Sequence, residues 1–503
     1  MEDTRIRKVV ILGGGTAGWM SAALLSKVAS GGIEIELVES EEIGTVGVGE
    51  ATIPQIRYLC DALRIPEAEF LAEVNGTYKL GIEFVNWARI GDRYIHTFGD
   101  VGRRLGILDF HHVWMRAREL GIERDIGDFS FNAMAAYANK FAPVDKLGDT
   151  GVLGIGYAFH FDATRVAGLL RRIAEKQGAR RTEGRVEHVD LNPDTGYIEA
   201  LRLDGGRRVA GDLFIDCSGF RSLLLGEALE VGYVDWSRWL PADSAIAVQC
   251  EGVEPLIPYT RATAHSSGWQ WRIPLQNRIG NGHVYSSPYM SDDEARNILL
   301  SNLDGRTLTE PLQLRFTTGK RETFWHKNCV GLGLASGFLE PLESTSIHLV
   351  QAGLGRLIDL FPTRRFHPAD VEVYNQRTHF DFDNIRDFLV LHYKATERDD
   401  SEFWNYCRTM EIPDSLEQKL ALWRSQGRFF RNEDELFTIP SWVQVLIGQR
   451  VLPKECHGIA KVLGKPDVED YLAKINGILK QAVAQMPTHR EFIDRTCRMR
   501  EAG

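Results

Sequence analysis

The stretch RKVVILGGGTAGWMSAALLSKVA constrains the fold most, because an apolar run passes through a glycine-rich turn into a helical pattern. Residues 9–12 read as a buried strand and the segment after the glycines as a helix. Gly13, Gly15 and Gly18 form GxGxxG, a pattern that permits a tight turn, close approach of a pyrophosphate and close packing of helix on strand. The pattern predicts a dinucleotide-binding βαβ unit.

The residues that follow extend this prediction. Thr16 and Ala17 open the helix, whose free N–H groups favour a phosphate. A second strand ends at Glu39, about 20 residues after Gly18, which is the spacing of the acid that binds a ribose hydroxyl. The motif does not separate FAD from NAD, and a glycine-rich turn in an unrelated α/β fold is the alternative.

A later segment favours a flavoprotein. Residues 213–217 read as a strand that ends in Ser218-Gly219, typical of two-domain flavoproteins in which the chain returns to the FAD domain. An amphipathic helix within residues 160–181 precedes it. Between them, turns at residues 194–196 and 204–206 predict a hairpin. This interrupted order predicts a flavin domain assembled from separated pieces.

Composition excludes several classes of partner. The 503 residues carry a formal net charge of −10 and no long basic run, so we expect no binding to nucleic acid or to an anionic membrane. The seven cysteines are scattered without zinc-ligand spacing. We therefore expect no metal site, and a reduced, cytoplasmic protein.

Four further stretches are more specific. They are GVGEATIP (residues 47–54), NGTYKLGIEFVNW (75–87), SGWQWRIP (267–274) and FLEPLESTSIHLV (338–350). With them the chain resembles the flavin-dependent halogenases of the tryptophan halogenase family, whose WxWxIP motif the third stretch matches. The resemblance runs from about residue 7 to about residue 400 and is weaker beyond.

The resemblance implies an α/β fold of the flavin monooxygenase (GR2) type, with a Rossmann-like FAD-binding domain and a substrate part of mixed sheet and helices. The expected FAD-binding segments are residues 1–90, about 150–225 and 320–365. The expected substrate-binding segments are about 91–149, 226–319 and 366–503, the last with a helical C-terminal region.

The resemblance also implies the chemistry. FAD, supplied as FADH2 by a separate flavin reductase, would convert oxygen and a halide ion, chloride or bromide, into hypohalous acid. Lys79 matches the family lysine that aims this oxidant at one carbon of an aromatic substrate. By itself Lys79 reads as an ordinary surface lysine, since lysines are mostly exposed. As a hydrogen-bond donor it would be charged, and as a haloamine it would react as the free amine.

Glu343 matches the family's active-site glutamate. A fixed carboxylate there would stabilise the cationic arenium intermediate and take its proton. The alternative is helix capping, because PLEST precedes a helical pattern. In the family, backbone N–H groups of the next residues bind halide, which here indicates Thr345 and Ser346. Ser346 stands where the family commonly has glycine in LESTG, so the resemblance leaves the preference between chloride and bromide open.

Aromatic residues are expected to surround the flavin and the substrate. Trp269 and Trp271 of WxWxIP would lie near the flavin and disfavour hydroxylation, although an ordinary strand also explains them. His96 and Phe98 match the family's HxF pattern beside the substrate, where a ring stacks on an indole or phenol. The other residues expected by resemblance are Gly49, Glu50, Ala51 and Leu339 at the cofactor, and Pro54 and Trp442 at the substrate.

The resemblance is weaker in the C-terminal segment with which family members that act on free tryptophan bind the amino-acid group of the substrate. Residues 435–453 contain Trp442 but no tyrosine pair followed by an acid. A buried ammonium without a partner is costly, so we expect indole or a larger indole- or phenol-bearing substrate. Residues 403–430 read as helices on the substrate side. A flavin-dependent hydroxylase and a non-catalytic flavin-binding protein are the alternative functions. Dimers are common in the family, so the resemblance allows a homodimer.

Overall fold

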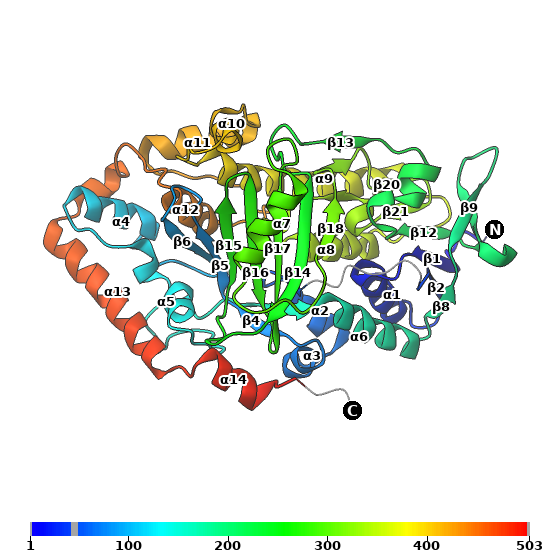
Figure 1. Cartoon of the computed structure of the whole chain (residues 1–503), viewed down its shortest axis with the longest axis horizontal. Helices are drawn as coiled ribbons and strands as arrows, with labels where there is room; N and C mark the ends of the chain where they lie inside the picture. The colour runs from blue at the N-terminus through cyan, green and yellow to red at the C-terminus, as the bar shows by residue number, and fades with distance from the viewer. Residues whose placement is uncertain (1–2, 42–48, 500–503) are drawn as a thin grey trace.

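The computed structural model of the chain describes residues 3–41 and 49–499, so residues 47 and 48 of the GVGEATIP stretch lie outside it. Two large sheets organise these residues, a mainly parallel one near the N-terminus and a mixed one in the middle of the molecule (Figure 1). This is the predicted α/β class.

The first sheet holds the predicted dinucleotide-binding unit. In spatial order its strands are β20 (Trp325–His326), β21 (Cys329–Gly331), β12 (Leu213–Asp216), β1 (Lys8–Leu12), β2 (Glu34–Glu39) and β8 (Arg180–Glu183). β1 is central and pairs in parallel with β2 and β12. The helices α1 (Thr16–Ala29) and α6 (Ala163–Lys176) pack against each other beside it. The strands predicted at residues 9–12 and 213–217 and the helix within residues 160–181 are confirmed.

Next to this sheet lies the predicted hairpin, which is a three-stranded antiparallel meander. Its strands are β9 (Val186–Leu191), β10 (Ile198–Leu203) and β11 (Arg208–Ala210). The predicted turns at residues 194–196 and 204–206 are the two connections. The six-stranded sheet takes its strands from all three segments that were expected to bind FAD.

The second large sheet is mixed. In spatial order its strands are β18 (Leu312–Arg315), β14 (Ser244–Glu251), β17 (Arg278–Tyr285), β16 (Gly268–Pro274), β15 (Thr260–His265), β5 (Gly81–Val85) and β6 (Arg93–Thr97). β15 and β5 are parallel, and the other pairs are antiparallel. β5 precedes the expected domain boundary at residue 90, yet it pairs within this sheet. The helix α7 (Asp292–Ser301) packs on β17.

Two small sheets contain the remaining strands. One is β3 (Gly49–Ala51), β7 (Ala158–Asp162) and β4 (Thr77–Lys79), and the other is β13 (Tyr233–Asp235), β19 (Gly319–Arg321) and β22 (Gly337–Phe338). β4 ends at Lys79, so this short strand fixes the backbone of the predicted catalytic lysine. Gly49 lies against β16, since a Cβ there would be 3.4 Å from Ile273 Cγ2.

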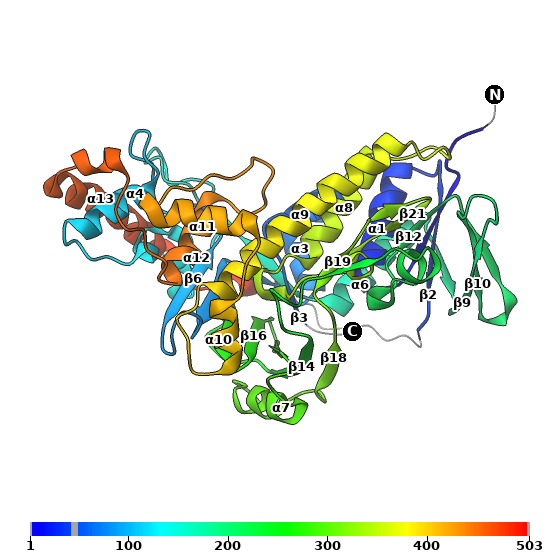
Figure 2. The ribbon, with the colours of Figure 1, turned by 90° about the horizontal axis from the view of Figure 1, so that it is seen from above.

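Helices surround both sheets. The first group is α2 (Ile56–Leu63), α3 (Glu67–Glu73), α4 (Phe110–Glu119) and α5 (Phe131–Tyr137). α8 (Ser346–Asp359) and the long α9 (Pro368–Lys394) run side by side, and α9 continues toward the helical end of the molecule (Figure 2). The C-terminal helices are α10 (Glu402–Thr409), α11 (Asp414–Gln426), α12 (Ile439–Gly448), α13 (Lys465–Gln485) and α14 (His489–Thr496). The helices predicted at residues 403–430 are α10 and α11.

Over residues 3–41 and 49–499, no helix has the length and apolarity needed to cross a membrane. Within the same residues, no group of three or more His, Cys, Asp or Glu side chains is arranged to hold a metal ion. All seven cysteines are free thiols.

Candidate active site

Lys79 is fully buried at the end of β4. Its Nζ donates hydrogen bonds to the Thr52 carbonyl oxygen at 2.9 Å and to Ser344 Oγ at 2.8 Å. Burial lowers its pKa to about 7, and the nearby charge of Glu343 only partly opposes this shift. Of the described residues, no carboxylate forms an ion pair with Lys79. The reading of Lys79 as an exposed surface lysine is therefore wrong.

The strand that carries Lys79 is held by residues from the far end of the chain. The Tyr78 backbone N–H donates to His489 Nε2 of α14 at 3.1 Å. The Tyr78 ring stacks on Phe141 with centroids 4.0 Å apart. Because side chains alternate along a strand, the packing of Tyr78 on one face directs Lys79 to the other.

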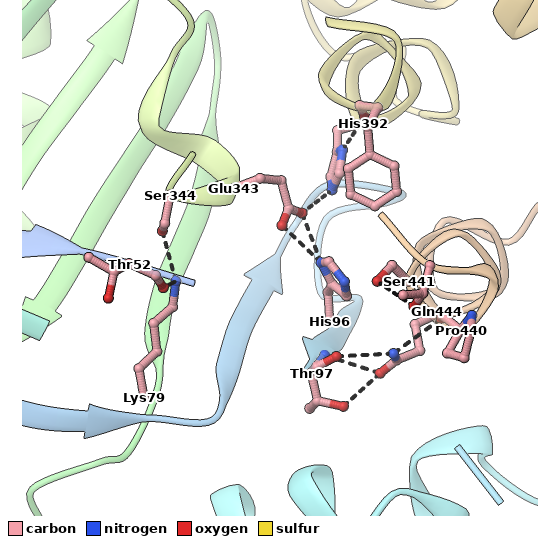
Figure 3. A network of polar contacts seen from close by, with 12 residues as sticks. Thr52, Lys79, His96, Thr97, Glu343, Ser344, His392, Pro440, Ser441 and Gln444 are labelled. Carbon is pink, nitrogen blue, oxygen red and sulfur yellow. Dashed lines mark hydrogen bonds and ion pairs between the residues drawn. The ribbon is translucent and has the colours of Figure 1, made fainter. Parts of the chain in front are cut away.

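Glu343 lies between two histidines. It ends a short 3-10 turn, Pro341–Glu343, and it is 2 % exposed. Its Oε2 is 2.9 Å from His96 Nδ1 of β6, and its Oε1 is 2.9 Å from His392 Nε2 of α9. Burial alone would raise the pKa of Glu343, but the two histidines lower it to about 2. Figure 3 shows the two rings approaching the carboxylate from different elements.

Each ring nitrogen of His392 lies against an oxygen acceptor. Its Nδ1 lies 2.8 Å from the Phe388 carbonyl oxygen, which only accepts hydrogen bonds, so Nδ1 carries a proton. Its Nε2 faces a carboxylate oxygen, which is also an acceptor. The contact of Nε2 with Glu343 Oε1 at 2.9 Å is close but lacks the geometry of a hydrogen bond. Glu343 caps no helix, since α8 begins without a side-chain cap, so the capping alternative is wrong.

The residues after Glu343 have the features of an anion site. Ser344 adopts a left-handed backbone conformation with φ of 59°, which is strained for a residue other than glycine. The buried Oγ1 of Thr345 has no hydrogen-bond partner among the described residues. α8 then starts at Ser346 with no acidic residue in its first turn. Free N–H groups at this helix start favour an anion.

Aromatic rings extend away from His96 and Lys79. Lys79 Nζ lies 5.2 Å from the centre of the Phe98 ring. The His96 ring contacts Phe388 at 5.5 Å and Phe437 at 6.3 Å between centroids. Phe388 in turn contacts Trp442 of α12 at 4.8 Å. We call Lys79, His96, Phe98, Glu343, Phe388 and Phe437 the reaction chamber.

Trp269 and Trp271 are both buried on β16, with ring centroids 6.2 Å apart. Trp269 Nε1 donates to Glu340 Oε2 at 2.9 Å, and Tyr393 of α9 donates to the same oxygen at 2.6 Å. Burial raises the pKa of Glu340 to about 7. Glu340 therefore ties the WxWxIP strand to α9 and to the turn that carries Glu343.

The glycine-rich turn has the shape of a dinucleotide site. A Cβ on Gly18 would lie 1.8 Å from the Gly13 carbonyl oxygen, so only glycine permits this helix–strand approach. No atom lies within 4 Å of a Cβ built on Gly15, where α1 begins at Thr16 and Ala17. Glu39 ends β2 beside Gly14 and bonds Arg181 at 2.5 Å. These residues fit a flavin dinucleotide.

The remaining predicted residues lie between these two sites. Gly49, Glu50 and Ala51 form β3 next to β16, and burial raises the pKa of Glu50 to about 7. Leu339 is buried directly before Glu340. Pro54 follows two residues after Thr52, whose carbonyl oxygen accepts the Lys79 hydrogen bond. The dinucleotide turn itself belongs to the six-stranded sheet, away from β4 and β6 (Figure 1).

The prediction from sequence missed several residues of the site. His392, Phe388 and Phe437 lie outside every motif quoted from the sequence. Glu340 and Thr52 lie within quoted motifs, but no role was predicted for either, and Thr52 acts through its backbone. The Ser344 side chain lay within a predicted motif, but its bond to Lys79 was not expected. His392 follows Phe388 by four residues on α9, a helical spacing that places both on one face.

A glycine-rich dinucleotide turn on a mainly parallel sheet, together with a buried Lys79–Ser344 and Glu343–histidine site, is typical of flavin-dependent enzymes, and comparisons with known proteins agree with this class. The tryptophan halogenase family profile matches residues 8–465. Xcc4156, a flavin-dependent halogenase from Xanthomonas campestris, is 47% identical with a TM-score of 0.96, covering 99% of this chain and 100% of its own. BrvH, a flavin-dependent halogenase from Brevundimonas sp. BAL3, is 42% identical with a TM-score of 0.94, covering 98% and 99%.

A curated relative, tryptophan 7-halogenase RebH from Lentzea aerocolonigenes, is 37% identical over 449 residues, which are 84% of this chain and 82% of RebH. This chain belongs to the tryptophan halogenase family. It is a flavin-dependent halogenase, and the hydroxylase alternative is not favoured.

Proposed function

We propose that this enzyme uses FADH2, oxygen and chloride or bromide to make hypohalous acid, and that Lys79 directs the halogen to one carbon of an indole-type substrate. The observation that carries this proposal is that Lys79, at the end of β4, bonds Ser344, the residue after Glu343, so the amine contacts the buried turn that carries the carboxylate. Burial removes competing water, and it strengthens each electrostatic interaction with the substrate.

FAD, reduced by a separate reductase, would supply two electrons to oxygen, and the halide would supply the other two as it is oxidised to hypohalous acid. Gly13, Gly15, Gly18 and the start of α1 would hold its pyrophosphate, and Glu39 its ribose. The halide would bind at the backbone of Thr345 and Ser346, where free N–H groups open α8. Ser346 stands where the family has glycine, and its side chain would influence whether chloride or bromide is preferred. Competition between the two halides in a Ser346→Gly variant would test this influence.

Lys79 would act as a charged donor to hypohalous acid. After bonds to Thr52 and Ser344, an ammonium keeps a third N–H free, and the Phe98 ring favours the cation. Glu343, held ionised by His96 and His392, would stabilise the arenium cation and take its proton. His96 would also contact the substrate ring, together with Phe98.

The contacts of the C-terminal region support indole or a larger aromatic molecule over free tryptophan. Glu435 lies two residues before Phe437 of the chamber, but its Oε2 bonds Lys419 at 2.8 Å and its Oε1 accepts the Asn432 N–H. Phe429 and Phe437 supply rings without hydroxyl groups beside Trp442 and Phe388. No free charge of the described residues in this region awaits a substrate ammonium. A homodimer remains a prediction.

The test is a mass-spectrometric assay of the purified protein with FAD, a flavin reductase, NADH, oxygen and halide, with indole and tryptophan in parallel. We expect the halogen isotope pattern on indole and little on tryptophan. Equal or better halogenation of tryptophan would refute the substrate assignment. Addition of one oxygen that persists without halide would refute the proposed halogenation.

A further inference from the structure

The strand β6 is the last strand of the seven-stranded sheet, and its end carries two residues of the reaction chamber. His96 is its next-to-last residue, and Phe98 directly follows its last residue, Thr97. The Phe98 N–H donates to the Leu80 carbonyl oxygen at 3.0 Å, so the backbone groups of residues 96 and 98 face β5. Backbone groups alternate in direction along an antiparallel strand, so the N–H and C=O of Thr97 face away from β5. They form part of a free sheet edge.

The side chain of Gln444, on α12, pairs with this free edge (Figure 3). Its Oε1 accepts the Thr97 N–H at 3.1 Å, and its Nε2 donates to the Thr97 carbonyl oxygen at 3.3 Å and to the Pro440 carbonyl oxygen at 3.2 Å. One carboxamide therefore binds both backbone groups of one residue, as a neighbouring strand would. The orientation of the amide follows from its partners, because an N–H only donates and a carbonyl oxygen only accepts.

Two further contacts hold β6 in place. Thr97 Oγ1 donates to Gln444 Oε1 at 2.8 Å and lies 3.0 Å from Oγ of Ser130, which caps α5. Gly448, one helical turn after Gln444, lies against the Tyr94 ring, since a Cβ there would be 2.3 Å from Tyr94 Cγ. Because Thr97 and Gln444 are buried, the Thr97 groups would stay unpaired if the amide were lost.

Thr97 is the backbone link between a contact of Glu343 and a contact of Lys79. His96 Nδ1 lies 2.9 Å from Glu343 Oε2, and the centre of the Phe98 ring lies 5.2 Å from Lys79 Nζ. His96 and Phe98 point to the same face of the strand, because side chains alternate along it. A shift of the backbone at Thr97 would therefore move both side chains relative to the two predicted catalytic residues.

We infer that Gln444 is a positioning residue, whose carboxamide holds the free edge of β6 beside the reaction chamber. Through Thr97 it fixes the places of His96 and Phe98. The inference rests on the proposed halogen transfer in that chamber. Gln444 lies outside the glycine-rich turn that would hold FAD, so loss of its amide should lower the fraction of oxidant that reaches the substrate and leave oxidant formation intact.

The main experiment compares the unaltered enzyme with Gln444→Met, which keeps the side-chain length and loses the amide. Each is supplied with FAD, a flavin reductase, NADH, oxygen, bromide and indole. Brominated indole is measured by mass spectrometry, and released hypobromous acid is measured with a chemical trap. The ratio of product to trapped oxidant should fall by about tenfold or more in Gln444→Met, because small misplacements around reacting groups are costly.

Two outcomes of this experiment are decisive against the inference, and they differ. If the unaltered enzyme brominates indole and the ratio in Gln444→Met is unchanged, the positioning role alone is overturned. If the unaltered enzyme brominates no indole, the proposed function fails, and the positioning role fails with it.

Asn328→Leu is the matched control, because Asn328 pairs with a strand in the same way. Its Oδ1 accepts the Ile198 N–H at 2.9 Å and its Nδ2 donates to the Ile198 carbonyl oxygen at 2.8 Å. Ile198 belongs to β10, at the opposite end of the molecule from β6 (Figure 2). Both variants should lose stability against urea, but only Gln444→Met should change the product ratio and speed up amide hydrogen exchange of residues 93–98. An equal fall of the ratio in Asn328→Leu would point to general destabilisation and overturn the inference.

Gln444→Glu gives an independent readout that depends on pH. A neutral carboxyl group has one donor and an acceptor, so it pairs with Thr97 as the amide does, whereas a carboxylate would face the Thr97 carbonyl oxygen without a proton. Burial favours the neutral form of the introduced group, and its hydrogen-bonding neighbours, Thr97 and Pro440, carry no charge.

The product ratio of Gln444→Glu, divided by that of the unaltered enzyme at the same pH, should therefore rise as the pH falls from about 8 to about 6. The same quotient for Gln444→Met should stay constant, because methionine does not ionise. A quotient for Gln444→Glu that does not rise overturns the inference, even if Gln444→Met does not fold.

Discussion

Lys79 Nζ donates a hydrogen bond to Ser344 Oγ at 2.8 Å, so the amine is tied to the residue that follows Glu343 (Figure 3). Lys79 comes from β4, and Ser344 comes from a turn 265 positions later in the chain. This bond joins the group that would aim the oxidant to the loop that would bind halide and accept the proton. The predictions below follow from it and from its neighbours.

Lys79→Met should separate oxidant formation from halogen transfer. Methionine has a similar length and no N–H, so the oxidant loses its donor while the glycine-rich turn is untouched. We expect halogenation of indole to fall below roughly one-hundredth of the original rate. Flavin oxidation, followed by absorbance, should persist. Retained halogenation would remove Lys79 from the reaction.

The pH dependence of halogen transfer should follow the ionisation of Lys79. Its pKa of about 7 means that the charged fraction falls as pH rises through 7. With an ammonium as donor, single-turnover halogenation at fixed oxidant supply should decrease above about pH 7. A rate that rises over the same interval would instead support the free amine and haloamine formation. The Lys79→Met residual rate, which lacks this ionisation, is the control.

Glu343→Gln should lower halogenation by about 10²- to 10⁴-fold, because the carboxamide keeps the shape but neither stabilises the cation nor accepts the proton. Hypohalous acid released to solution, measured with a chemical trap, should not fall in parallel. His392→Gln should have a smaller effect, since His96 still holds the carboxylate. If both variants lose substrate halogenation and release of hypohalous acid in parallel, Glu343 instead supports formation of the oxidant at the flavin.

Glu340 should act as a neutral acid that positions Trp269 and Tyr393. Glu340→Ala leaves both donors unpaired, which should cost about 1–3 kcal/mol in the free energy of unfolding by urea. Glu340→Gln should restore stability and halogenation, because an amide accepts the same bonds. The raised pKa of about 7 predicts that Glu340 reduces stability as pH rises from 4.5 to 7. Glu340→Gln should remove this loss, and its persistence would contradict a neutral Glu340.

Gly18→Ala should weaken FAD binding, because the added Cβ would lie 1.8 Å from the Gly13 carbonyl oxygen and push α1 away from β1. We expect the Kd of FAD, measured by fluorescence quenching, to rise by roughly tenfold or more, equivalent to ~1.4 kcal/mol. Gly477→Ala in α13 is a matched control with no atom near the new methyl group. Unchanged FAD affinity in Gly18→Ala would argue against this turn as the cofactor site.

The local parts of the fold were accessible from the sequence. β1, α1, β2, β12 and α6 follow from apolar periodicity and from two glycines of the turn. Gly13 has a positive φ that favours glycine, and Gly18 lies too close to the Gly13 carbonyl oxygen for a Cβ. The motifs around Lys79, Glu343 and WxWxIP identified the family, and they contain the two predicted catalytic residues, Lys79 and Glu343. The domain boundaries and the roles of the site residues remain predictions, because they depend on where FAD and the substrate bind and not on local residue patterns.

The sequence by itself determined the dinucleotide-binding unit and the family, since both depend on short-range patterns of residue type and spacing. Only the tertiary structure decided what surrounds Glu343. His96, Glu343 and His392 come from β6, a 3-10 turn and α9, and no local rule pairs residues so far apart in the chain. The pKa values of Lys79 and Glu340 likewise depend on burial, which long-range packing alone creates.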